Sequence, residues 1–463
     1  MTPAWLPAAR LAERRAAATG PLSPLARSLA ADLAPVLDRA IEIPTEKARL
    51  SRAGGRCPRD GTMLAFDPYA PRRHRCPTCG GEFDDEAHHR YWIVGYHLWL
   101  AERAVHAAAL HALGGEARHA AFASEVLDRY ADAYARWPNV DNVLGPTRPF
   151  FSTYLESIWL LQLCVALDLL EGVAGAGPLG GRVRDGLVAP SVALIAGYDE
   201  GDSNRQVWNN AALLAGARLL GDGALAERCV WGPSGVTGHL ARALLADGTW
   251  YEGENYHLFA HRGLWYGVHL AEAAGQGPLD AEGVRRFDEG FAAPFATALP
   301  DLTFPARRDS QYAVSLRQWR FAELAELGLA RHPDDRRLHA ALARLYDGAA
   351  PRRDTGRARS TAEAERNEPA SALGRAGLGW RSLLFALPEL PPARAAAPGS
   401  VLLPAQGLAV LRRDAGRTYA ALDYGVSGGG HGHPDRLNLL LAVGDERWLD
   451  DPGTGSYVDP SLH

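Results

Sequence analysis

The chain has 463 residues, of which 47% are hydrophobic and 22% charged, and its formal net charge is −5. This length allows two or three domains with a large core, and the composition is that of a soluble globular protein. A weakly negative chain offers no basic field for nucleic acid or acidic lipid, so neither is expected as a partner. The start lacks a secretory signal pattern, no later run approaches about 18 consecutive apolar residues, and the cysteines are too few for a disulfide framework. We therefore expect a cytoplasmic protein without a membrane segment.

Residues 1–86 form an N-terminal segment with two cysteine-proline turns, CPRDG at Cys57 and CPTCG at Cys76. Two such knuckles at this spacing are close to a zinc ribbon, in which turn glycines let backbone amides face the thiolates. Asp60 stands where the first knuckle would carry its second thiolate, and zinc also accepts carboxylate oxygen. We expect Cys57, Asp60, Cys76 and Cys79 to hold a structural zinc ion. The alternative is a pair of turns that keeps its shape without metal.

Residues 87–347 repeatedly place apolar residues at helical spacing, as in FFSTYLESIWLLQLCVALDLL. Short connections favour antiparallel neighbours, so this series of helical hairpins predicts a toroid or solenoid of helix pairs. Residues 348–371 are polar and rich in charge, and they are expected to form a linker or surface loop.

Residues 372–463 consist of short apolar or alternating runs bounded by Gly, Pro and Asp, which indicates a β-sheet. Only five or six strands fit into this length, whereas a β-sandwich normally needs more strands to cover both faces. We therefore expect an α+β multidomain protein whose last domain is a partial, apparently truncated sandwich.

Two polar clusters precede or begin predicted helices. In GDSNRQVWNNAALLAG (residues 201–216), Asn209 and Asn210 are poor helix formers beside Trp208, which favours hydrogen bonds to a ligand. In DGTWYEGENYHLFAHRG (residues 247–263), aromatic and acidic residues occur together, as in clefts where rings cover a sugar face and carboxylates bind its hydroxyls. The alternatives are a helix cap in the first cluster and an aromatic helix start packed in the core in the second.

The third cluster is GVSGGGHGHPDRLNLLL (residues 425–441), where His431 and His433 alternate along an extended chain and so point to opposite sides. One histidine is expected to face a cleft. The other is expected to bind a metal ion together with an acid such as Asp451. A glycine-rich turn without a ligand is the simpler alternative.

Taken together, these clusters resemble the heparinase II/III-like polysaccharide lyases, which include oligoalginate lyases and exo-acting glycosaminoglycan lyases. The matching pieces, in the family's order, are the cysteine knuckles, PTRPFFSTYLESIWLLQL, SNRQVWNNAAL, DGTWYEGENYHLFAHRG, GGGHGHPDRLNLLL and WLDDPGTGSY. They span most of residues 55–457. The resemblance implies an incomplete (α/α) toroid followed by an antiparallel β-sandwich.

The resemblance also implies a reaction, the β-elimination of a 4-linked uronic acid. Such a site neutralises the uronate carboxylate, removes the C5 proton and supports the O4 leaving group. Tyr256 is then the base and the acid, and Asn209 and His431 neutralise the carboxylate. Substrate binding falls to Arg148, Arg205, Trp208, Asn210, Glu252, His257 and His261. A structural zinc ion in the sandwich is bound by His433 and Asp451.

Two features depart from the family pattern. Many oligoalginate-type relatives carry histidine where this chain has Asn209, and its absence favours a tyrosine-only syn elimination, which suits glucuronate or mannuronate. A later histidine that would complete the zinc set has no counterpart up to His463. The expected function is an exolytic lyase acting on uronate-containing oligosaccharides. The alternatives are an (α/α)-barrel glycoside hydrolase, with Glu252 and Glu254 as its carboxylate pair, or a non-catalytic carbohydrate-binding protein.

Overall fold

The computed structural model describes residues 3–51, 54–175, 177–277, 279–349, 372–392, 397–425 and 435–453. Its helices are α1 (Ala8–Thr19), α2 (Ser23–Leu37), α3 (Glu86–Gly114), α4 (Ala117–Ala133), α5 (Thr153–Ala174), α6 (Pro178–Val183), α7 (Ala189–Ala196), α8 (Gln206–Leu220), α9 (Gly223–Trp231), α10 (Val236–Arg242), α11 (Glu254–Ala273), α12 (Ala281–Gly290), α13 (Ala293–Thr297), α14 (Trp319–Arg331), α15 (Arg336–Leu345) and α16 (Trp380–Phe385). Its strands are β1 (His74–Arg75), β2 (Glu82–Phe83), β3 (Val401–Leu403), β4 (Leu408–Arg413), β5 (Thr418–Asp423), β6 (Asn438–Val443) and β7 (Glu446–Leu449). The predicted linker 348–371 lies almost wholly outside the described residues.

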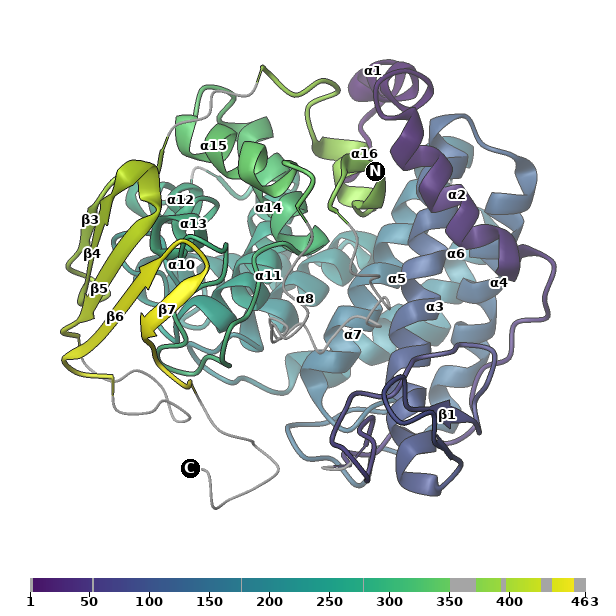
Figure 1. Ribbon diagram of the computed structural model, residues 1–463. Helices are drawn as coiled ribbons and strands as arrows, with labels where there is room; N and C mark the ends of the chain where they lie inside the picture. The colour runs from purple at the N-terminus through teal and green to yellow at the C-terminus, as the bar shows by residue number, and fades with distance from the viewer. Residues whose placement is uncertain are drawn as a thin grey trace.

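The helices form a toroid of hairpins with an inner and an outer layer (Figure 1). Helices α3, α5, α8, α11 and α14 are the inner layer, and each packs against the next. Each inner helix is followed by an outer partner, such as α4 after α3 and α15 after α14. The short α16 packs on both α14 and α3. The described helices therefore make an incomplete (α/α) toroid, in which a six-residue helix takes the place of a full hairpin.

Helix α5, which packs between α3 and α8 in the inner layer, is buried along most of its length. Among the described helices it is the one whose length and hydropathy would suit a membrane span, and 72% of that apolar stretch is buried inside the protein. A core helix has the same composition, so this property is weak evidence for a membrane.

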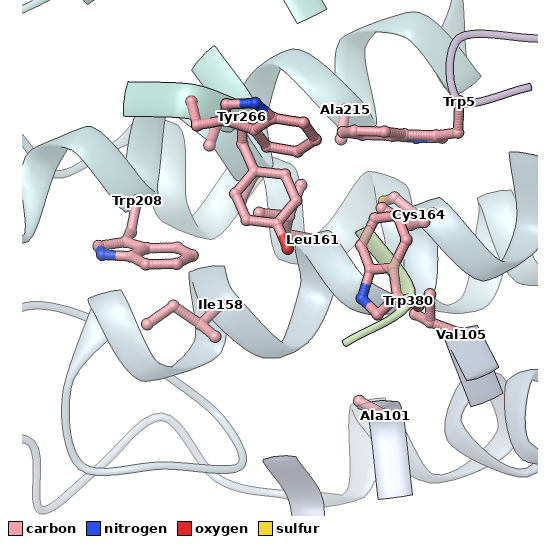
Figure 2. Packing of buried hydrophobic residues seen from close by; sticks show 14 of the residues in the cluster. Trp5, Ala101, Val105, Ile158, Leu161, Cys164, Trp208, Ala215, Tyr266 and Trp380 are labelled. Carbon is pink, nitrogen blue, oxygen red and sulfur yellow. The ribbon is translucent and has the colours of Figure 1, made fainter. Parts of the chain in front are cut away.

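Segments on both sides of residues 87–347 also enter the helical core (Figure 2). The indole of Trp5 stacks on Trp265 at 6.3 Å and meets the edges of Tyr266 and Trp380 at 5.8 and 5.9 Å. Aromatic pairs at these distances add to the free energy gained by burying apolar area. The N-terminal residues and α16 therefore belong to the helical domain in space, and the sheet begins only at Val401.

Strands β3 to β7 form a five-stranded antiparallel sheet in sequential order. One face packs on the loop after α13, around Leu299, with Leu408, Val410, Tyr419, Ala421, Leu440 and Ala442. The phenol of Tyr419 donates to the carbonyl of Thr297 at 3.0 Å. The alternating pattern of these strands thus turns one set of side chains toward the helical domain, as period-2 patterning requires.

The opposite face of the sheet is apolar and exposed. Leu402, Leu411 and Trp448 have 64%, 65% and 67% of their surface accessible, and the exposed set continues with Leu422, Leu439, Val443 and Leu449. The register places Leu402 opposite Ala409, and Leu422 opposite both Ala409 and Leu439, so the apolar surface runs across the strands. In the described residues this sheet is one layer of the predicted sandwich.

The two domains meet in a polar seam built around Arg307. Its guanidinium, which is 1% exposed, bonds Glu254 at the start of α11, Asp423 at the end of β5 and Gln406 between β3 and β4. Gln406 in turn donates to Thr249 Oγ1 at 2.6 Å. One buried cation thus ties the first turn of α11 to the sheet.

Candidate active site

The starts of α8 and α11 lie side by side at one end of the toroid and are joined by hydrogen bonds. Asn204 Nδ2 donates to Glu252 Oε2 at 2.7 Å, and the Tyr251 phenol reaches the carbonyl of Asp202 at 3.3 Å. One turn further in, the Trp208 indole donates to the carbonyl of Phe259 at 3.1 Å. The first and second polar clusters of the sequence therefore lie together in the folded chain.

Asn209 and Asn210 lie on the first turns of α8 with 0% and 4% of their surface exposed. Asn209 Oδ1 accepts from Ser157 Oγ at 2.7 Å, and its Nδ2 donates to Gln206 Oε1 at 3.3 Å. Asn210 Nδ2 donates to the carbonyl of Ser234 at 2.7 Å. Both amides are thus held by hydrogen bonds to the protein on a buried helix, and their expected bonds to a ligand stay a prediction.

Arg205 precedes α8 and has a third of its side chain exposed, so it is the accessible cation of this cluster. Its Nε is hydrogen-bonded to the carboxylate of Glu200, which is itself 4% exposed. Burial opposes the charge on Arg205, but the bond to Glu200 and the charge of that carboxylate raise the arginine pKa above its usual value. Arg205 therefore stays cationic at any working pH.

Tyr256 lies in the first turn of α11, two residues after Glu254, and is partly buried against the helical core. A second tyrosine, Tyr251, lies in the loop just before α11. Burial, followed by the charge of Glu252, raises the pKa of Tyr251 to about 12. Tyr251 therefore remains protonated near neutral pH and is a poor base.

Arg148 lies on the loop before α5, and this loop is held at several points. Lys47 Nζ is 2.6 to 3.2 Å from four oxygens of the loop, including the carbonyls of Val140 and Thr147. The Arg148 amide donates to Glu156 Oε2 at 2.9 Å, and its guanidinium donates to the carbonyl of Trp137 at 2.8 Å. Glu156 neighbours Ser157, the partner of Asn209, so the Arg148 loop is tied to the same turn of α5.

Three predicted substrate-binding residues lie inside the core instead. Trp208 is 1% exposed and packs on Phe259 and Tyr266. Both ring nitrogens of His257 are bonded to the backbone, Nδ1 to the Trp250 amide and Nε2 to the Gly290 carbonyl. His261 is also fully buried and bonds the carbonyl of Phe287. Their contacts are packing and backbone contacts, because α8 and α11 are inner helices buried on nearly every side.

The four predicted ligands of the N-terminal knuckles come together, with donor atoms all within 4.8 Å of one another. Cys57 Sγ and Cys79 Sγ are 3.6 Å apart, and Cys76 Sγ is 3.4 Å from Asp60 Oδ2. Zinc–sulfur bonds of about 2.3 Å in a tetrahedron place two thiolates about 3.7 Å apart. The donor set therefore fits a zinc ion.

The two knuckles share one backbone geometry. Gly61 and Gly80 have φ of +71° and +70°, and their amides donate to the carbonyls of Cys57 and Cys76 at 2.9 and 3.0 Å. Backbone amides also face the thiols, with Cys79 N at 3.4 Å from Cys76 Sγ. The Thr62 amide bonds the Asp60 carboxylate and lowers its pKa to about 2, so this group is ionised and ready to bind a cation.

The second predicted zinc site is only partly described, because His431 and His433 lie outside the described residues. Asp451 is 1% exposed, with its carboxylate bonded to Asn438 Nδ2 at 2.5 Å and to the Gly453 amide at 2.8 Å. The roles of His431, His433 and Asp451 stay predictions.

Sequence reasoning missed several residues that build the site, among them Ser157, Gln206 and Arg307. Gln206 lies within the first polar cluster of the sequence. The two adjacent arginines in FPARRDS were the sequence feature that could have indicated the polar seam between the domains. Arg308 has a left-handed φ of +57°, which is unusual for a residue other than glycine, and its amide donates to Asp435 Oδ2 at 2.6 Å.

Comparisons with known proteins agree with this architecture. Residues 395–463 match the family model described as Heparinase II/III-like, C-terminal. Over these residues the chain is similar to the heparinase II/III-like family. No curated protein sequence matched the chain.

Several solved structures share the fold of this chain at low identity. A heparinase III structure matches with a TM-score of 0.52 and 13% identity, covering 94% of this chain and 59% of that chain. A heparinase III gene product matches with a TM-score of 0.50 and 14% identity, over 80% and 52% of the two chains. An alginate lyase from Bacteroides ovatus matches with a TM-score of 0.50 and 14% identity, over 83% and 99%. The chain thus spans between half and three fifths of the length of these two heparinase III chains.

Proposed function

We propose that the protein is a polysaccharide lyase that cleaves 4-linked uronic acid residues by β-elimination. The observation that supports the proposal is the joining of the α8 and α11 starts by hydrogen bonds, because Asn209, Arg205 and Tyr256 lie at these starts on a fold similar to that of heparinase III. Solved structures with a similar fold are those of a heparinase III and an alginate lyase. Both names fit a uronate-containing oligosaccharide as the substrate.

The proposed reaction gives each of these residues a role. Asn209 donates a hydrogen bond to the uronate carboxylate, which makes the C5 proton more acidic by stabilising the enolate-like charge. Tyr256, as phenolate, takes the C5 proton. The C4–O4 bond breaks, the electron pair forms the C4–C5 double bond, and the tyrosine returns its proton to the departing O4. Arg205 and Arg148 bind the negative charges of neighbouring sugars. Asn210 and Glu252 contribute indirectly, through the hydrogen bonds that they make within the protein.

A glycoside hydrolase is the competing enzyme class, and one observation weighs against it. Such an enzyme needs two carboxyl groups facing the sugar. Glu254 is 1% exposed and its carboxylate is paired with Arg307 at 3.0 Å. Glu252 accepts from both Asn204 and the Trp250 indole at 2.7 Å. Neither carboxylate is placed as a free acid or base. A non-catalytic sugar-binding protein is the remaining alternative.

The deciding experiment follows the ultraviolet absorbance of the product, because only a lyase creates a double bond conjugated to the carboxylate. The purified chain is incubated with alginate, hyaluronan, chondroitin and heparan oligosaccharides. Tyr256→Phe is expected to abolish the rise in absorbance, whereas Tyr251→Phe, the same chemical change on a phenol with a pKa of about 12, retains turnover. Equal loss in both variants, or no rise with any substrate, contradicts the proposal.

Two finer features belong to the same proposal. Release of one unsaturated unit at a time from the first minutes would establish exolytic action, whereas a ladder of intermediate sizes would show endolytic cleavage. Cytoplasmic action is expected on short oligosaccharides delivered from outside. The five cysteines, all within the described residues, form no disulfide, and this supports a reducing compartment.

We also propose that Cys57, Asp60, Cys76 and Cys79 hold a structural zinc ion. The site lies against the start of α3, where His88 stacks on Phe83 at 5.5 Å and its Nε2 is 3.0 Å from the carbonyl of Arg56. Elemental analysis of the purified chain should give one zinc per molecule. Cys76→Ser should lose that zinc, whereas Cys229→Ser, which changes a buried thiol outside the cluster, should retain it. Equal zinc contents in the two variants would contradict the assignment.

A further inference from the structure

Three buried amide side chains at the start of α8 form one continuous hydrogen-bonded chain. Asn209 Nδ2 donates to Gln206 Oε1 at 3.3 Å, and Gln206 Nε2 donates to Asn210 Oδ1 at 3.0 Å. Asn210 Nδ2 then donates to the carbonyl of Ser234 at 2.7 Å. At the other end, Ser157 Oγ lies 2.7 Å from Asn209 Oδ1. Each amide thus donates in the same direction along the chain.

Backbone groups fix the direction of this chain. The Glu200 amide can only donate, and it lies 2.9 Å from Gln206 Oε1, so this end of Gln206 must be its oxygen. The Ser234 carbonyl can only accept, so the Asn210 atom that faces it must be nitrogen. Both constraints agree, because the Gln206 nitrogen then meets the Asn210 oxygen.

The orientation of Asn209 follows from its neighbours. Since Gln206 presents an oxygen, Asn209 must present Nδ2 to it, and Asn209 Oδ1 then faces Ser157. The serine hydroxyl, which also lies 3.0 Å from the carbonyl of Thr153, therefore has the Asn209 oxygen as one of two acceptors for its single proton. A primary amide has two N–H groups, and Gln206 takes one of those on Asn209. In the described part of the chain, the second N–H has no protein acceptor among the bonds given above, so it is the group left for a ligand.

We propose that Ser157, Gln206 and Asn210 are positioning residues that hold this second N–H of Asn209 toward the uronate carboxylate. This inference rests on the proposed lyase function. An inverted Asn209 would turn its oxygen toward the carboxylate and repel it. Asn209 has no exposed surface in the unliganded protein, so the substrate reaches it only when a neighbouring side chain moves. Burial also makes a preoriented donor more effective, because water does not compete for it.

The test compares two buried glutamines changed in the same way. Gln206→Met breaks the amide chain, whereas Gln162→Met alters a 5%-exposed glutamine of α5 whose Nε2 contacts the Tyr266 phenol at 3.3 Å. Kinetics on the best oligosaccharide of the panel are expected to show a kcat loss of about 100-fold for Gln206→Met, the scale of losing a preorganised donor. Gln162→Met should retain kcat within about threefold, which controls for a loss of stability.

A double mutant separates positioning from a purely structural role. In an Asn209→Ala background the Gln206→Met change has nothing left to position, so it should lower kcat no further. Ser157→Ala should give a smaller kcat loss, of about tenfold, which Ser157→Thr restores by returning the hydroxyl.

The outcomes are distinguishable. An active wild type in which Gln206→Met behaves like Gln162→Met, or in which Gln206→Met and Asn209→Ala reduce kcat independently, overturns the positioning role and leaves the lyase proposal standing. A wild type that produces no unsaturated product from any substrate overturns both proposals.

Discussion

Arg307 and Glu254 form an ion pair in which both side chains are 1% exposed, with Nε and Oε1 3.0 Å apart. The same guanidinium reaches Asp423 Oδ2 at 3.0 Å, so two carboxylates from different domains depend on one cation. Removing one member of a buried ion pair leaves an uncompensated charge in a medium that solvates it poorly. The seam between toroid and sheet is therefore sensitive to this single residue.

Arg307→Met is expected to lower the free energy of unfolding by about 3 to 5 kcal/mol, because two buried carboxylates lose their partner. Denaturant titration followed by circular dichroism measures the change. Arg285→Met is the matched control, since Arg285 pairs with Glu282 at the surface and such a pair contributes at most about 1 kcal/mol. Similar small losses in both variants would show that the seam contributes little to stability.

Local patterns predicted much of this fold. The knuckles at Cys57 and Cys76 were predictable because each depends on five consecutive residues, the last of which is a glycine with positive φ. Helix α5 and the strands with alternating side chains were predictable from the spacing of apolar residues alone. The seam was not predictable, because the partners of Arg307 lie 53, 99 and 116 residues away in the sequence.

For the candidate site, the sequence indicated segments that the structure brings together, but not the orientation of each side chain. Trp208 and His257 lie on inner helices that are buried on nearly all sides, and on such helices apolar periodicity does not mark which face meets a ligand. Asn209 was recognisable as an unfavourable helix residue, whereas its partner Ser157 lies 52 residues earlier on α5. Pairings of this kind become visible only once the helices are packed.

Acid should destabilise the protein through its core histidines. Burial lowers the pKa of His257 and His269 to about 4 and that of His97 to about 3, below the value of about 6.5 for an unfolded chain. Between pH 6.5 and 4 the unfolded state binds more protons than the folded state. Stability therefore falls as pH falls through this window, by up to about 1.4 kcal/mol per pH unit for each histidine. Denaturant titrations at stepped pH measure the slope, and a flat profile would contradict the burial of these rings.

At the metal site, one substitution is expected to strengthen zinc binding. Asp60 occupies the position of a fourth thiolate, with its carboxylate oxygens 3.4 and 3.6 Å from Cys76 Sγ. Asp60→Cys is expected to tighten zinc binding, because thiolate is the preferred ligand of structural zinc. Competition with a chromogenic chelator measures the affinity. Asp67→Cys adds a thiol to the same segment outside the cluster and should change the affinity little. Weaker binding by Asp60→Cys would mean that the site is shaped around the carboxylate.

The apolar outer face of the sheet predicts self-association. Leu402, Leu411 and Trp448 are each more than three fifths exposed, and contiguous apolar patches of this kind on a soluble protein mark contact surfaces. Leu411→Lys and Trp448→Lys should shift the chain toward monomer in sedimentation velocity and reduce binding of a hydrophobic dye, with little change in melting temperature, because neither side chain packs in the core. Val410→Lys, the neighbouring residue on the inner face, should instead unfold the sheet, since it is fully buried. A wild type that is monomeric at high concentration and binds no dye would show that this face is not a contact surface in solution.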